Sequence, residues 1–176
     1  LDKWDAAKSF KDNICRLVLT PSGALYGEAD AVISSELREL SAYSTILAAI
    51  ARGENKLNDI FHATGFSRAK ISVYLKNLAT FNIVEKVVSF ETGGWENAKE
   101  GVYQIKDTFV NFWFKFVYPN MSNLYLLSPE EFYDTYIEKE LDAYLERYFR
   151  EVCTEYLLIL NQMGQLPFTI KRVGTW

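Results

Sequence analysis

The sequence predicts a mainly α-helical fold with one small β-hairpin, organised around a winged helix-turn-helix at residues 41–106. Two observations support this. Three consecutive stretches repeat their apolar residues at helical spacing, and each has its own start and stop residues. The apolar period then changes to that of strands. Hydrophobic residues make up 49% of the 176 residues, which is enough for a packed core in one domain or two small ones.

The N-terminal segment, residues 1–40, reads as helical. Apolar residues recur at helical spacing through residues 5–19, and the run from Thr20 to Gly23 interrupts the pattern. A second short helix is expected at residues 28–38. The segment therefore precedes the winged helix-turn-helix as a helical unit.

The three helices of the central domain are defined by their ends. Ser41 is the expected N-cap of the first helix, and Gly53 ends it. A short second helix around residues 57–61 closes at Gly65, where the tight turn falls. Ser67 caps a third helix over residues 67–81, which occupies the place of the recognition helix in this fold.

Two strand patterns follow the third helix. Residues 83–88 and 101–105 are rich in β-branched residues. A polar connection with a double glycine, residues 91–96, lies between them. Three helices followed by a hairpin with a long tip is the element order of a winged helix.

Three features are expected in the remainder of the chain. The aromatic stretch 109–118 stops at Pro119 and is expected to form core between domains in a connector, residues 107–136, rather than a membrane-surface helix. A long helix with one apolar stripe is expected at residues 137–162, closed by Gly164. Residues 168–171 resemble the start of a strand, so residues 137–176 read as the opening of a truncated domain.

The third central helix is the predicted DNA-binding element. Ile71, Leu75 and Leu78 are expected to face the core. No acidic residue occurs between Ser67 and Val84, so lysine and arginine there can contact phosphates, and arginine and asparagine can read base edges. The residues expected on or near the open face are Arg68, Lys70, Ser72, Tyr74, Lys76 and Asn77. The alternative is an ordinary solvated helix in a winged helix that binds protein.

Charge is distributed unevenly. The formal net charge is −4, but residues 41–106 hold eight Lys/Arg against six Asp/Glu, and residues 119–155 hold three against nine. An acidic whole argues against indiscriminate nucleic-acid binding and leaves a local basic helix available for it.

The chain shows no complete catalytic site. His62 has no nucleophile near it in the sequence, and no glycine is followed directly by a lysine, so a phosphate-binding loop is absent. The acid pairs of residues 138/142 and 151/155 are read as solubilising charge rather than metal ligands. Cys15 and Cys153 form no metal-binding pair and fit a cytoplasmic protein, with a disulfide left open. No apolar run reaches the roughly 18 residues of a membrane span.

Six segments along nearly the whole chain carry a family resemblance, and they are residues 19–26, 36–43, 71–76, 103–107, 112–120 and 174–176. Together, and in the same order, they resemble the C-terminal half of a family of prokaryotic, especially archaeal, P-loop ATPases of the AAA type.

The resemblance implies a division of the chain. Residues 1–40 correspond to the end of the ATPase lid, and the N-terminus, which lacks a methionine, is expected to lie inside a longer parent. ATP and magnesium would bind in the parent's N-terminal module, and this chain itself holds no cofactor. Residues 137–176 correspond to the start of a domain similar to restriction-endonuclease-like nucleases. Glu151 stands where such folds place an acidic residue, and the metal-binding Asp and Glu-x-Lys would follow Trp176.

Two positions depart from the family's pattern. Val73 stands where such winged helices commonly carry a basic or polar residue, which removes one DNA contact. Asn82 replaces the usual glycine after the recognition helix. Asparagine tolerates the left-handed conformation that a helix end needs, so the fold is expected to persist.

The leading hypothesis is therefore a region that targets a parent ATPase to double-stranded DNA. Its partners would be DNA and the parent's own ATPase module, with homo-oligomerisation open and no membrane. The rival is a protein-interaction or dimerisation module without DNA, which an exposed patch of Phe112, Trp113 and Phe116 would favour. A third hypothesis is a metal-dependent nuclease completed beyond Trp176.

Overall fold

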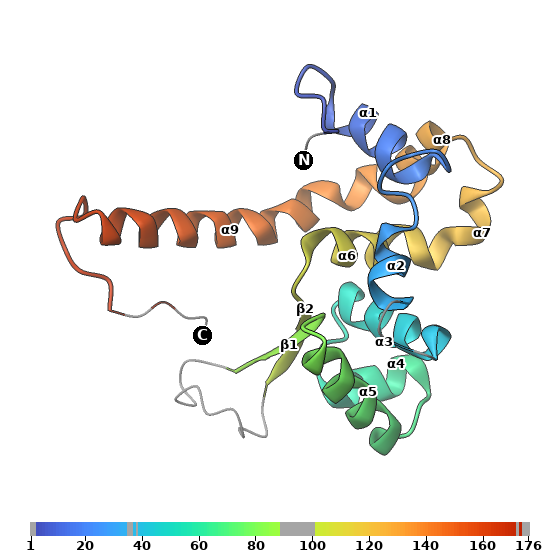
Figure 1. Ribbon diagram of the computed structural model, residues 1–176, viewed down its shortest axis with the longest axis horizontal. Helices are drawn as coiled ribbons and strands as arrows, with labels where there is room; N and C mark the ends of the chain where they lie inside the picture. Colours follow the sequence, from blue (N-terminus) through green and yellow to red (C-terminus); the bar gives the residue numbers. More distant parts are fainter. Residues whose placement is uncertain (1–2, 35–36, 38, 89–100, 172, 174–176) are drawn as a thin grey trace.

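The computed structural model describes residues 3–34, 37, 39–88, 101–171 and 173. Its described part is mainly helical, with one two-stranded antiparallel sheet, as the sequence predicts. Figure 1 shows a body that contains every element except the far half of the last helix, which projects away from it. Apolar side chains from residues 14–137 form one continuous core in this body.

The first N-terminal helix is shorter than predicted. Helix α1 spans Phe10–Ile14 and continues as the π-helix η1, Cys15–Leu19. Ser9 caps α1 by accepting a hydrogen bond from the Asp12 amide, so residues 5–8 stay outside the helix. Helix α2 spans Glu28–Ser34, and residues 35, 36 and 38 of the predicted helix lie outside the described residues.

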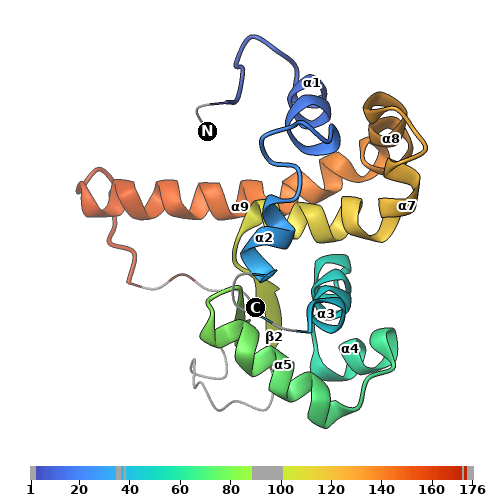
Figure 2. The same ribbon diagram turned by 45° about the vertical axis from the view of Figure 1, so that its right-hand side comes forward.

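Three helices and two strands follow in the predicted order. They are α3 (Leu40–Arg52), α4 (Leu57–Thr64), α5 (Arg68–Thr80), β1 (Val84–Val87) and β2 (Val102–Ile105). The strands pair antiparallel, with Val84 opposite Ile105 and Val87 opposite Val102. Helix α5 packs on α4 and β1, and α3 contacts α4 and β2 (Figure 2). The predicted hairpin tip lies outside the described residues.

Most of the predicted boundaries in this region are confirmed. Gly53 and Gly65 end their helices at positive φ, 104° and 68°, a backbone conformation that glycine adopts without steric cost. Asn82 adopts φ 60°, so the asparagine does take the left-handed conformation. Ser41 is not the N-cap of α3, because the helix begins at Leu40, which puts Glu39 in the cap position and Ser41 inside the helix.

The aromatic stretch forms core. Helix α6 (Thr108–Phe112), the π-helix η3 (Trp113–Val117) and the 3-10 helix η4 (Tyr118–Asn120) run on without a break, so Pro119 does not end the segment. Proline is tolerated there because an amide near a helix start has no intrahelical partner. Phe112, Trp113 and Phe116 are all buried. The apolar patch that would have favoured the protein-interaction hypothesis is therefore not exposed.

Three further helices complete the described chain: α7 (Met121–Leu124), α8 (Pro129–Tyr136) and α9 (Glu138–Gln162). The start of α9 packs on α6 and η3 through Tyr144, whose ring lies 5.1 Å from that of Phe116. Residues 168–171 do not form the predicted strand. The Ile170 amide instead donates to the Asn161 side chain at 2.7 Å, and neither β1 nor β2 pairs with this segment.

Candidate nucleic-acid interface

Helix α5 is held against the body by an apolar stripe. Ile71, Leu75 and Leu78 are buried, as predicted from their spacing. The Ser67 hydroxyl accepts a hydrogen bond from the Lys70 amide at 3.2 Å and caps the helix start. The opposite face of α5 is left in solvent, and we call residues 68, 69, 72, 73 and 76 the exposed face of α5.

Three of the six predicted DNA-contacting residues lie outside this face, and they are Lys70, Tyr74 and Asn77. Tyr74 is only 8% exposed, and its ring lies 4.3 Å from that of Tyr43 on α3. Its hydroxyl donates to the Glu39 carboxylate, and this hydrogen bond, with burial and the charge of Glu39, raises the pKa of Tyr74 to about 12. The Asn77 amide donates to the Tyr43 hydroxyl at 2.8 Å and is half-buried.

The burial of Tyr74 corrects its predicted placement on or near the open face, whereas the half-buried Asn77 lies at the edge of that face. Tyr74 follows Ile71 by three residues and precedes Leu78 by four, so it lies beside the buried stripe rather than opposite it. That spacing was the available signal. The partnership of Asn77 with Tyr43 depends on how α5 crosses α3, which no local pattern in the sequence reports.

The cations of α5 differ in how they are held. The Arg68 guanidinium donates to the Asn58 amide oxygen at 2.6 Å and stacks 4.1 Å from the ring centre of Phe61. The Lys70 ammonium lies 4.5 Å from the ring centre of Phe66 and is half-buried at the edge of the face. The Lys76 side chain is exposed and has no hydrogen bond or ion pair within the described residues.

The spacing of these cations suits a nucleic-acid groove. Arg68 and Lys76 are eight residues apart, which is about 12 Å along a helix. Small or short side chains, Ala69, Ser72 and Val73, lie between them. The major groove of B-DNA is also about 12 Å wide, so the two cations can lie near opposite phosphate strands while the short side chains face base edges.

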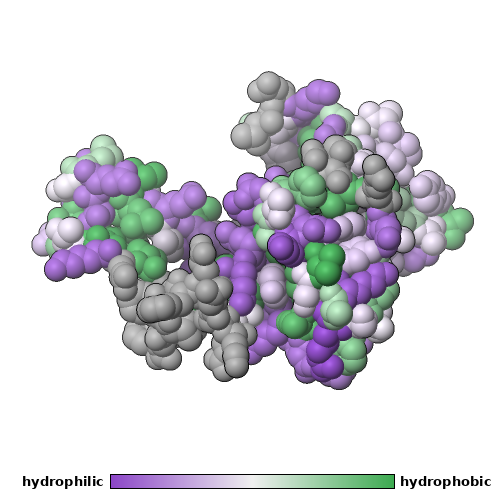
Figure 3. All heavy atoms as spheres, turned by 60° about the horizontal axis from the view of Figure 1, so that its bottom comes forward, coloured by the Kyte–Doolittle hydropathy of each residue, from purple (hydrophilic) through white to green (hydrophobic). Residues whose placement is uncertain are grey.

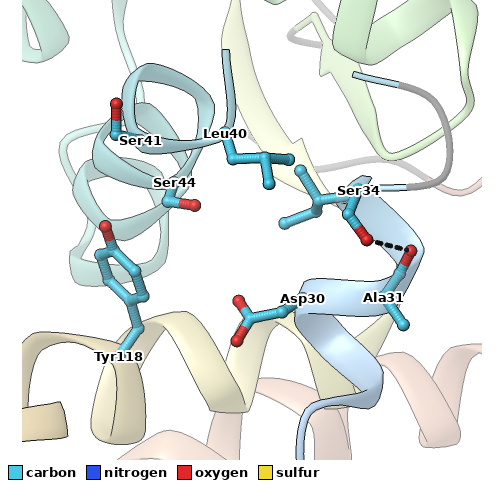
Figure 4. A pocket seen from close by; sticks show the side chains of 8 residues that line it. Asp30, Ala31, Ser34, Leu40, Ser41, Ser44 and Tyr118 are labelled. Atoms are coloured by element: carbon cyan, nitrogen blue, oxygen red, sulfur yellow. Dashed lines mark hydrogen bonds between the residues drawn. The ribbon is translucent and has the colours of Figure 1, made fainter. Parts of the chain in front are cut away.

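A hollow of about 640 Å³ between α2, α3 and η4 is a second site of interest. Figure 4 shows the Asp30 carboxylate and the Ser44 and Tyr118 hydroxyls pointing into it. Partial burial raises the pKa of Asp30. The named lining residues include no histidine, lysine or cysteine, so they supply one acid and no partner base or nucleophile. They are Asp30, Ala31, Ile33, Ser34, Leu40, Ser41, Ser44 and Tyr118.

The remaining candidate catalytic and metal-binding residues do not form a site within the described parts of the chain. His62 and Glu151 are exposed on α4 and α9. No group of three or more His, Cys, Asp or Glu residues within the described parts of the chain is placed to hold a metal ion. Both cysteines are free thiols, and burial raises the pKa of Cys15 to about 11. Among the described residues, every helix is too short or too polar to cross a bilayer.

Comparison with known proteins gives a partial match. Residues 113–176 match the model of a family described as archaeal and bacterial proteins of unknown function. An uncharacterized protein of Methanocaldococcus jannaschii is 33% identical over 150 residues, which are 85% of this chain and 33% of the relative. The chain therefore spans about a third of that relative's length. No solved structure matches the chain.

Proposed function

We propose that residues 40–105 form a winged helix-turn-helix that binds double-stranded DNA through the exposed face of α5. The observation that carries the proposal is this face itself, a groove-length row with Arg68 and Lys76 at its ends, Lys70 at its edge and no acidic residue on the helix. In this proposal Tyr74 and Asn77 hold α5 in place through their contacts with Tyr43 on α3. They orient the face and make no DNA contact.

Electrostatics supports DNA over a protein partner at this face. A protein interface of ordinary kind has an apolar centre, whereas the exposed face of α5 has cations and short side chains. Its one large apolar residue is Val73, which is 57% exposed. Lysine and arginine side chains make the phosphate contacts of DNA-binding proteins. The Lys76 ammonium is available for such a contact because it has no hydrogen-bond or ion-pair partner within the described residues.

We propose further that this region targets a parent ATPase of the AAA type. The support is the ordered resemblance along the chain and the M. jannaschii relative, most of whose length lies outside the aligned residues. ATP would bind in the parent's own module. The proposal places the protein in the cytoplasm, where free cysteines such as Cys15 and Cys153 are usual.

The test is DNA binding by this chain measured by fluorescence anisotropy. A random-sequence duplex is titrated at salt concentrations from about 50 to 200 mM, and the slope of log affinity against log salt is recorded. The variant is Lys70→Glu with Lys76→Glu. The matched control is Lys8→Glu with Lys139→Glu, which has the same total change of charge. Lys8 lies before α1 and Lys139 lies on α9, and both are exposed.

The expected result is salt-sensitive binding by the wild type. The α5 double variant should flatten the slope by about 1.8, because each phosphate contact contributes about 0.9. The control should bind within about twofold of the wild type. Absence of binding at the lowest salt, or equal loss in both double variants, would reject the exposed face of α5 as the DNA-binding surface.

A further inference from the structure

The far half of α9 presents large apolar side chains to solvent. Among the described residues of this 25-residue helix none is buried. Phe149 is 68% exposed, Val152 60% and Tyr156 61%. Figures 1 and 2 both show this half projecting from the body, and Figure 3 shows hydrophobic residues on it. An exposed apolar surface of this size in water indicates a surface that another protein surface covers.

These side chains follow a regular spacing. Along α9 and its C-cap, six of the exposed apolar residues occur at steps of four, three, four, three and four residues, the repeat of helices that pair along their length. Leu157 and Leu158 are also exposed and lie outside this row. The row is about 27 Å long at 1.5 Å per residue. We call it the α9 seam, and it consists of Leu145, Phe149, Val152, Tyr156, Ile159 and Met163.

Nothing else in the described chain covers the seam. The helix packs on the body through Leu141 and Tyr144, and the seam begins one residue after Tyr144. The segment after α9 is tied back by Asn161, whose amide oxygen accepts from the Ile170 amide at 2.7 Å. Asn161 lies two residues from both Ile159 and Met163, so it points to the opposite side of the helix.

We propose that the α9 seam binds the α9 seam of a second copy of this chain in an antiparallel pair. One register fills every layer with apolar side chains. In it Leu145 meets Met163 of the partner subunit, Phe149 meets Ile159 of the partner subunit, and Val152 meets Tyr156 of the partner subunit. The two-fold axis crosses the seam at the level of residue 154 along the helix, so each contact occurs twice.

Charge selects the antiparallel direction. The nine charged residues of α9 lie between Glu138 and Glu155, and none lies between residues 156 and 162. A parallel pair would set each of these charges beside its own copy, and the two bodies would share one end. An antiparallel pair sets the charged half of one helix against the uncharged half of the other and places the bodies at opposite ends. The dipoles of the two antiparallel helices also point in opposite directions, which is favourable.

The register makes a specific structural prediction about Cys153. It lies one residue from the two-fold axis on the flank of the seam, so the two copies of Cys153 face each other. Cys15 is buried in the body and is not accessible to a reagent in the folded chain. A short bismaleimide, which adds one thiol at each end, should therefore link two chains through Cys153.

The experiment measures the mass of the full 176-residue chain by light scattering from low to high micromolar concentration. The variants are Val152→Asp and Ile159→Asp, made separately. The control is Thr154→Asp, which adds the same charge on the opposite side of α9. Far-ultraviolet circular dichroism and thermal unfolding verify that each variant folds, and bismaleimide linking is run with the wild type and Cys153→Ser.

The expected result is a concentration-dependent dimer, twice 20.3 kDa, for the wild type and the control. Both seam variants should be monomers, and linking should require Cys153. A wild type that stays monomeric throughout overturns the proposal and leaves the seam to another protein or to further polypeptide. A dimer that survives both seam variants also overturns it, and a seam-dependent dimer without Cys153 linkage overturns the register. DNA binding plays no part in these measurements, so this proposal stands or falls separately from the proposed function.

Discussion

Helices α5 and α9 both expose one long face, but the two faces have opposite chemistry. Helix α5 is capped by Ser67, packed on α4 and β1, and offers cations and short side chains to solvent. Helix α9 is fixed to the body only at its start and exposes Phe149, Val152 and Tyr156. Exposed cations are stable in water and favour a polyanion, whereas large exposed apolar side chains cost free energy until protein covers them. Two faces of one chain therefore point to two kinds of partner.

The largest expected effect separates the anchored start of α9 from its projecting half. Phe116→Ala should lower the free energy of unfolding by about 3–5 kcal/mol, because the ring is 2% exposed and packs against Phe112 and Tyr144. Phe149→Ala, on the projecting half, should change it by less than about 0.5 kcal/mol. Urea unfolding followed by circular dichroism, at concentrations that keep the chain monomeric, measures both. Equal losses would show that the projecting half also contributes to the core of the monomer.

A smaller effect tests how α5 is anchored. The pKa of Tyr74 is raised from 10.0 to about 12, first by its hydrogen bond to Glu39. A raised pKa in the folded state means that this contribution to stability is complete below pH 10 and is lost as the pH rises to about 12. Tyr74→Phe should therefore be less stable than the wild type at pH 8 and should lose less stability between pH 10 and 12.

Urea midpoints at these pH values test this, with Tyr156→Phe as the control because its ring is 61% exposed. Each variant removes one tyrosine hydroxyl, so the difference between Tyr74→Phe and Tyr156→Phe isolates the contribution of the buried Tyr74 hydroxyl. Parallel pH profiles for Tyr74→Phe and the wild type would mean that the Tyr74 hydroxyl does not stabilise the packing of α5 on α3.

The elements of the fold could largely be predicted because their signals are local. Ser67, Gly65 and Asn82 are each recognised from the conformation that their position demands, and all three have it. Helix α9 begins and ends within one residue of the prediction, because a long apolar stripe followed by glycine is a local pattern. The strand expected at residues 168–171 is absent, because a strand needs a neighbouring strand and neither β1 nor β2 pairs with it.

The candidate interface could be predicted only in part, because the sides of a helix are decided by what it packs on. Ile71, Leu75 and Leu78 were identified by spacing alone. Tyr74 has a polar end and an apolar ring, so composition allowed either side, and only its contact with Tyr43 decides the matter. The stacking of Arg68 on Phe61 likewise joins α5 to α4, and the spacing of residues within either helix does not predict it.

The smallest expected effect sharpens the contrast between the two faces by adding a charge to α5. Val73 is 57% exposed between Arg68 and Lys76, so Val73→Lys places a third cation on the exposed face without disturbing the core. One added phosphate contact steepens the salt slope by about 0.9, so affinity should fall about threefold more than in the wild type between 50 and 200 mM salt. Ser122→Lys, at the exposed position of α7, adds the same charge away from α5 and should leave the slope unchanged. Anisotropy titrations distinguish the cases: if both variants steepen the slope equally, DNA responds to net charge, and if only Val73→Lys does, DNA lies along α5.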